Sequence, residues 1–85
     1  MVFIFKTIYS KIIEKKRIKE SKKEAMFMIK QGFMNREKNV IHAIEKEPII
    51  FDSVVDHLIG NGYEVKLLRG EIPGSKYKIV EVSEV

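Results

Sequence analysis

The chain has 85 residues, of which 45% are hydrophobic and 33% are charged, and its formal net charge is +4. This length excludes a multidomain enzyme, and a longest apolar run of five residues excludes a bilayer span, which needs about 20. The absence of cysteine excludes disulfides, thiolate nucleophiles and cysteine-bound zinc or iron–sulfur centres. We therefore expect a single domain over residues 1–85 in the cytoplasm, with no enzymatic activity, metal or cofactor.

A long helix is predicted near the N-terminus. Residues 2–8 fit either a short strand or the first turns of this helix, because they mix β-favouring aromatic residues with helical spacing. From Ser10 to about Gln31 the residues are strong helix formers without proline or glycine, and Gly32 is suited to the left-handed position after the helix. Its predicted apolar face consists of Ile18, Ala25 and Ile29.

Residues 39–46 decide between two folds. Val40, Ile41 and Ile44 have helical spacing, with Asn35 as a possible cap and Pro48 as a stop, and this favours a second helix. The same short, β-branched stretch also fits a strand.

A short helix and a β-hairpin are predicted to follow. Asp52 is placed to cap a helix over residues 52–60, and the glycines around Asn61 would end it. Alternating residues 63–69, a Pro73-Gly74 turn and a return strand from Tyr77 predict the hairpin.

These elements predict an α+β fold with a long N-terminal helix, one or two further helices and a C-terminal β-hairpin. If residues 36–47 are helical, the order becomes winged-helix-like. The helix at 52–60 carries Asp52 and Asp56 but no basic residue, so its insertion into a DNA major groove is not expected.

Basic residues are concentrated in the first part of the chain. Residues 1–38 hold eleven basic and four acidic side chains, a balance of +7, whereas residues 39–85 hold five and eight, a balance of −3. The same pattern also fits a solvated helix with Lys–Glu pairs, but six basic and three acidic side chains in residues 14–24 leave an excess. We expect this excess to attract DNA or RNA.

The hairpin is predicted to add basic groups as a wing. Placing Tyr63, Val65, Leu67, Tyr77 and Ile79 on the inner face directs Lys66, Lys76 and Lys78 outward. An ordinary solubilising role for these lysines is the alternative. The complete set of predicted phosphate-contacting residues is Lys15, Lys16, Arg17, Lys19, Lys22, Lys23, Lys66, Arg69, Lys76 and Lys78.

A second predicted surface is apolar. Methionine and phenylalanine side chains cluster near the end of the long helix, and they fit either an ordinary core or a contact with an acidic protein partner or a second copy. These residues are Met26, Phe27, Met28, Phe33 and Met34. A membrane-surface contact through the apolar N-terminus and the lysines is a third possibility.

The C-terminal segment carries a resemblance. Residues 58–65, with Gly-Tyr-Glu-Val at 62–65, followed by Tyr77-Lys78-Ile79, resemble the ending of many small α+β proteins of bacteriophages and mobile elements. The resemblance implies a small regulator or host-directed inhibitor and favours a strand for residues 40–44. It implies no activity and no site residues.

Overall fold

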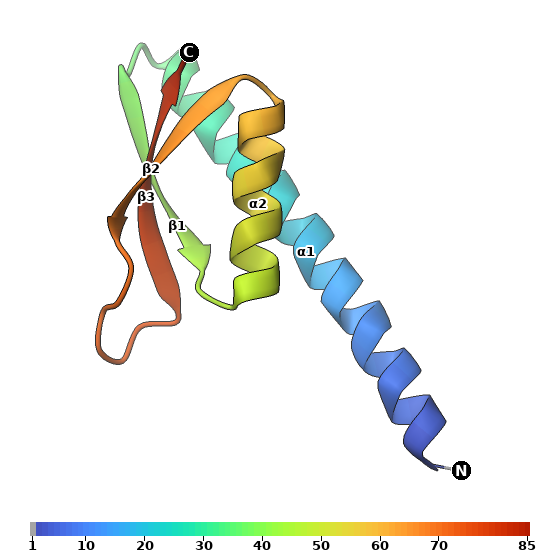
Figure 1. The fold of residues 1–85 in the computed structure, drawn as a ribbon. Coiled ribbons are helices and arrows are strands. Elements are labelled where there is room, and N and C mark those ends of the chain that lie inside the picture. The colour runs from blue at the N-terminus through green and yellow to red at the C-terminus, as the bar shows by residue number, and fades with distance from the viewer. Residues whose placement is uncertain (1) are drawn as a thin grey trace.

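The computed structural model describes the backbone from residue 2 to residue 85 and the side chains from Glu14 onward. It contains helix α1 (Val2–Met34), strand β1 (Asn39–Glu45), helix α2 (Pro48–Gly60) and strands β2 (Tyr63–Arg69) and β3 (Tyr77–Glu84). The antiparallel sheet has the order β1-β3-β2, and both helices lie on the same side of it (Figure 1). The predicted α+β class, long N-terminal helix, short second helix and C-terminal hairpin are confirmed.

The helix favoured for residues 39–46 is wrong, because this segment is the edge strand β1. Val40 and Ile44 alternate with exposed neighbours and enter the core, and the strand pairs along its length with β3. The central strand β3 offers one side for pairing, and these β-branched residues pair with it as an edge strand. Helical spacing over so few positions does not exclude a strand. The winged-helix arrangement, which required a helix here, is not confirmed.

The ends of both helices differ from the predicted ends. Helix α2 begins at Pro48, whose fixed φ suits a first helical position, so Asp52 lies inside the helix and does not cap it. Helix α1 continues past Gly32 to Met34, and Arg36 takes the left-handed conformation with φ of 64°. Residues 2–8 belong to this same helix, whose first turns extend beyond α2 and the sheet (Figure 1).

The core lies between the helices and the inner face of the sheet. Phe33 of α1 and Tyr63 of β2 stack beside it, with ring centroids 5.6 Å apart. This stacking joins the end of α1 to the start of β2. The buried core residues are Ala25, Ile29, Val40, Ile44, Ile50, Val54, Leu58, Val80 and Val82.

The predicted pleat of the return strand is inverted. Val80 and Val82 are the buried residues of β3, so Tyr77 and Ile79 alternate onto the face without helices. Lys78 consequently lies on the helix side, with its Nζ 4.7 Å from the centroid of the Phe51 ring. The opposite pleat would direct the carboxylate of Glu81, in the middle of the strand, toward the core, and burying an unpaired charge is costly.

Gly32 marks a close approach between α1 and β1. A Cβ atom added at this position would lie 2.5 Å from Cγ2 of Val40, a branched side chain with little rotational freedom. We expect Gly32→Ala to lower the free energy of unfolding by about 1–3 kcal/mol through overpacking, although alanine favours a helix. Urea denaturation would measure this effect.

Gly60 provides the matched control, since a Cβ there would meet nothing within 4 Å. Gly60→Ala should leave stability unchanged or slightly raised. Equal stability of the two variants would contradict the described α1–β1 contact.

Candidate nucleic-acid interface

Four lysines gather in one groove between α1 and the C-terminal end of α2. Lys22 and Lys23 follow Lys19 by three and four residues, and Lys30 follows Lys23 by seven, which places all four along one side of α1. The groove has a volume of about 420 Å³. We call it the lysine groove, and its lining residues are Lys19, Lys22, Lys23, Met26, Lys30, His57 and Asn61.

The lysine groove contains no carboxylate. Among the side chains from Glu14 onward, the only ion pairs are those of Arg17, so the groove lysines have no acidic partner. Lys19, Lys23 and Lys30 are exposed, and Lys22 is half-buried beside them. Neighbouring like charges raise the local positive potential, and free ammonium groups are good point-charge ligands for phosphate.

Arg17 lies outside this groove and is bound to two carboxylates. Its guanidinium is 2.8 Å from an oxygen of Glu45 and 3.1 Å from one of Glu47. The hydrogen bond from Arg17 to Glu45, followed by the charges of Glu45 and Glu47, raises the pKa of Arg17. Arg17 thus links α1 to the end of β1 and the connection that leads to α2, and two carboxylates balance its charge.

The basic residues of the hairpin do not join the lysine groove. Lys66 lies opposite Glu81 in the register of β2 and β3, on the open face of the sheet, whereas Lys78 lies on the helix side over Phe51. Lys76 lines a separate cavity of about 600 Å³ together with Arg17 and both of its carboxylate partners. Arg69 stands at the exposed end of β2. The predicted wing therefore does not present its basic groups on one face.

Sequence reasoning identified part of the groove. Lys19, Lys22 and Lys23 were predicted and lie together, whereas Lys15 and Lys16 are exposed on α1 outside the lining. Lys30 was missed, although its spacing from Lys23 and Met26 could have identified it. His57 and Asn61 were missed because only the packing of α2 against α1 brings them to the groove.

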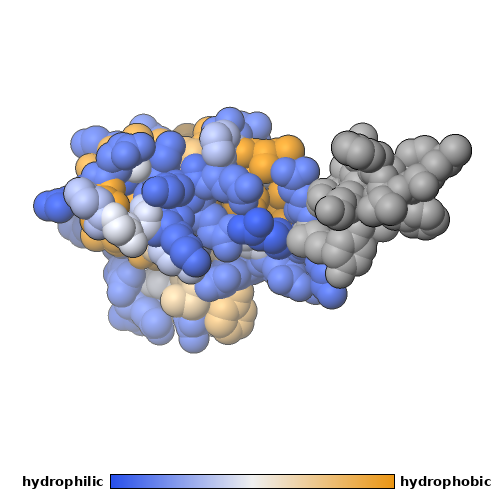
Figure 2. Space-filling view, turned by 90° about the horizontal axis from the view of Figure 1, so that it is seen from below, coloured by the Kyte–Doolittle hydropathy of each residue, from blue (hydrophilic) through white to orange (hydrophobic). Residues whose placement is uncertain are grey.

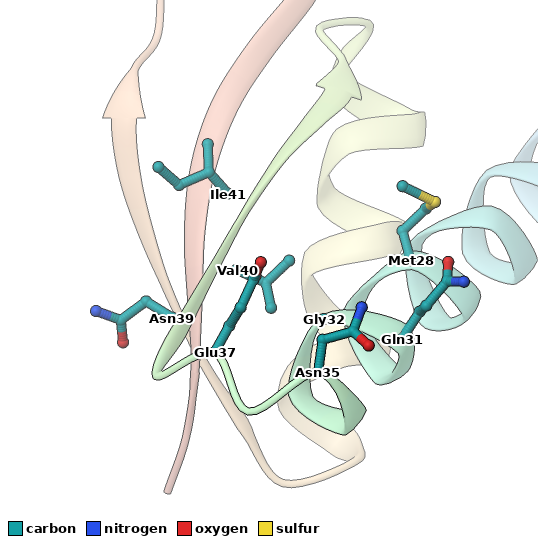
Figure 3. Close-up of a pocket in the computed structure, with 8 residues that line it drawn as sticks. All are labelled: Met28, Gln31, Gly32, Asn35, Glu37, Asn39, Val40 and Ile41. Carbon is teal, nitrogen blue, oxygen red and sulfur yellow. The ribbon is translucent and has the colours of Figure 1, made fainter.

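The predicted Met/Phe surface is divided by the structure. Phe27 and Met34 are 65% and 82% exposed, whereas Met26 and Phe33 are partly buried against the core. Met28 lines a cavity beside β1 (Figure 3). On the face drawn in Figure 2, hydrophilic residues cover most of the surface and hydrophobic residues form separate patches. The five residues are therefore not one surface.

His42 of β1 is half-buried beside Ser21 and Glu24 of α1, in a cavity of about 70 Å³. Burial lowers its pKa below the ordinary value of 6.5, and the negative charge of Glu24 opposes this shift. The unfolded chain therefore binds this proton more readily than the folded protein does. The contribution of neutral His42 to the free energy of unfolding is fully present above about pH 6.5. It is lost as the pH falls toward and through the lower pKa that His42 has in the folded protein.

We expect His42→Gln to reduce this acid-dependent loss of stability, because glutamine does not titrate. Urea midpoints between pH 7.5 and pH 5 would measure the effect, with His57→Gln as the control that retains His42. A loss of the same size in His42→Gln and the unsubstituted protein would contradict the assignment.

Comparisons with protein-family models, curated proteins and solved structures found no match. No helix of the described chain is both long and apolar enough to cross a membrane. Within the described residues, no group of three or more His, Asp or Glu side chains could hold a metal ion.

Proposed function

We propose that this protein binds nucleic acid through the phosphate backbone and that the lysine groove is the contact site. One observation supports the proposal most strongly. Lys19, Lys22, Lys23 and Lys30 converge on one groove that no carboxylate lines. The groove lies between two packed helices, which fix the backbone positions of these lysines.

The extent of the groove favours a polymer of phosphates over a single phosphate. Lys19 and Lys30 are eleven residues apart in α1, a distance of about 16 Å along the helix axis. Successive phosphates of one DNA strand rise by about 3.4 Å, so this length faces several of them. A single phosphate would meet only one or two of the lysines.

Weak sequence selectivity is expected. The Asn61 side-chain amide donates a hydrogen bond to the backbone carbonyl of His57, 2.6 Å away, and is already engaged. Lysine ammonium groups bind phosphate oxygens without reading the base edges. The remaining lining offers few groups that could distinguish bases.

Salt-dependent binding tests the proposal. The affinity for a fluorescent DNA duplex and for single-stranded DNA and RNA would be measured between 50 and 200 mM salt. Three to four phosphate contacts predict a slope of log affinity against log salt of about −3 to −4 for the duplex. No binding at the lowest salt concentration, or an affinity that salt does not change, would contradict the proposal.

Two single substitutions on α1 compare the effect on DNA binding of losing a groove lysine with that of losing the ion-paired Arg17. We expect Lys23→Gln to weaken duplex binding several-fold and to reduce the salt slope by about one. Arg17→Gln removes the same charge, yet its guanidinium is held by Glu45 and Glu47, so binding should change less than twofold. Equal losses in these two variants would indicate that net charge alone controls binding.

A second candidate is binding to an acidic protein. The exposed Phe27 and Met34 lie on α1 near the lysines and would supply apolar contacts that nucleic acid does not need. Salt would weaken such a complex less, and Phe27→Ala with Met34→Ala would weaken it strongly. The same two substitutions should leave phosphate binding nearly unchanged.

A further inference from the structure

The two edges of the sheet are built differently. The β2 edge has a register shift between Leu67 and Arg69, and it carries Lys66 and Arg69. Irregular pairing and basic residues are common devices that prevent further strand pairing. Strand β1 has neither device: its seven residues pair regularly with β3, and it contains no lysine, arginine, proline or glycine.

Main-chain groups on the outer side of β1 are free to pair. Just beyond β1, the Lys46 N–H donates to the Lys76 carbonyl on the β3 side, 2.9 Å away. Main-chain N–H and C=O groups alternate in direction from one residue to the next along an antiparallel strand. The main-chain groups of Val40, His42 and Ile44 therefore point toward β3. The groups of Asn39, Ile41, Ala43 and Glu45 therefore point to the open edge.

This edge borders open space. A cavity of about 550 Å³ is lined by the first residues of β1 and by Met28, Gln31 and Asn35 of α1 (Figure 3). A separate, smaller cavity of about 70 Å³ follows β1 from His42 to Glu45, and Ser21 and Glu24 of α1 also line it. No described residue of the chain occupies the position of a further strand here.

We propose that β1 pairs with β1 of a second copy in antiparallel orientation about a two-fold axis at His42. The two three-stranded sheets then form one continuous sheet of six strands. In this register, Ile41 exchanges hydrogen bonds with Ala43 of the second copy, and Asn39 exchanges them with Glu45. All the free main-chain groups of the edge acquire partners, whereas a shift by two residues leaves those of Asn39 or Glu45 unpaired.

The side chains of β1 match in the same register. Buried Val40 faces Ile44 of the second copy on the helix side, and Ile41, which is 64% exposed, faces Ala43 on the open side. The only charged residue of β1, Glu45, faces uncharged Asn39 and is neutralised by Arg17 of its own chain. A shift by one residue would oppose buried and exposed positions. The hydropathy of β1 is thus symmetric about His42.

Sedimentation equilibrium without nucleic acid tests the pairing independently of the proposed function. We expect the unsubstituted protein to form a dimer and Ile41→Lys to weaken it at least tenfold, because each copy would then place an ammonium group inside the joint, opposite Ala43 of the other copy. Leu67→Lys is the control, since it adds one charge at a half-exposed position on the β2 edge and should leave the dimer intact. Circular dichroism would verify that both variants fold.

A chain that is monomeric at every concentration, or equal weakening by both substitutions, would overturn the proposal. The register has its own test in His42→Cys, which introduces the only cysteine. Opposed residues of a non-hydrogen-bonded pair have Cα atoms about 4.5 Å apart, within reach of a disulfide. Mild oxidation should therefore give a covalent dimer, and a dimer that does not cross-link would overturn the register centred on His42.

Discussion

Replacing Lys19, Lys23 and Lys30 together with glutamine is expected to weaken binding to a DNA duplex by about 10- to 100-fold near 0.1 M salt. The same substitutions should reduce the salt slope by about three, because each lysine lost removes about one released counterion. All three side chains are exposed and contact no acidic partner, so the fold should be retained. Fluorescence anisotropy at several salt concentrations would measure both quantities.

A control with the same loss of charge distinguishes the lysine groove from a general electrostatic effect. Lys66, Arg69 and Lys76 lie on the hairpin outside the groove, and their replacement by glutamine also removes three positive charges. Binding by this variant should fall by less than a few-fold. Equal losses in the two triple variants would show that no particular site on the surface is used.

The second large effect concerns stability. Leu58 of α2 is fully buried in the core, and Leu58→Ala should lower the free energy of unfolding by about 2–5 kcal/mol. Total stabilities of small domains are about 5–15 kcal/mol, so this variant should be close to unfolding at 37 °C. Urea denaturation monitored by circular dichroism would give the difference.

The neighbouring residue supplies the control for this prediction. Ile59 follows Leu58 in α2 but is 54% exposed, so Ile59→Ala should cost less than about 1 kcal/mol. Similar costs for the two substitutions would mean that α2 is rotated about its axis relative to the sheet.

Local signals were sufficient for much of the fold. The Pro73-Gly74 turn fixes the hairpin connection, and Gly74 has the positive φ of 78° that such a turn allows glycine. The long run of helix-forming residues likewise predicted α1. Residues 39–46 required tertiary information, because their helical and extended patterns are equally good until a sheet partner is known.

The candidate site was harder to predict from the sequence than the fold, because contacts between residues far apart in the chain determine which side chains come together. Arg17 was predicted to contact phosphate, but its carboxylate partners lie 28 and 30 positions away in the sequence, where no local pattern can reveal them. Lys78 was assigned to the wrong face because Ile79 and Val80 are both apolar and either could have pointed inward. Lys19, Lys22 and Lys23 were predicted correctly as neighbours because helical spacing alone brings them together.

An NMR titration with a short DNA duplex at low salt tests the nucleic-acid proposal most directly. Amide resonances of α1 from Lys19 to Lys30, with those of His57 and Asn61, should shift progressively as duplex is added. Resonances of Lys66 and Glu81 on the open sheet face should remain in place. Shifts confined to the sheet, or none at protein and duplex concentrations near 1 mM, would contradict phosphate binding in the lysine groove.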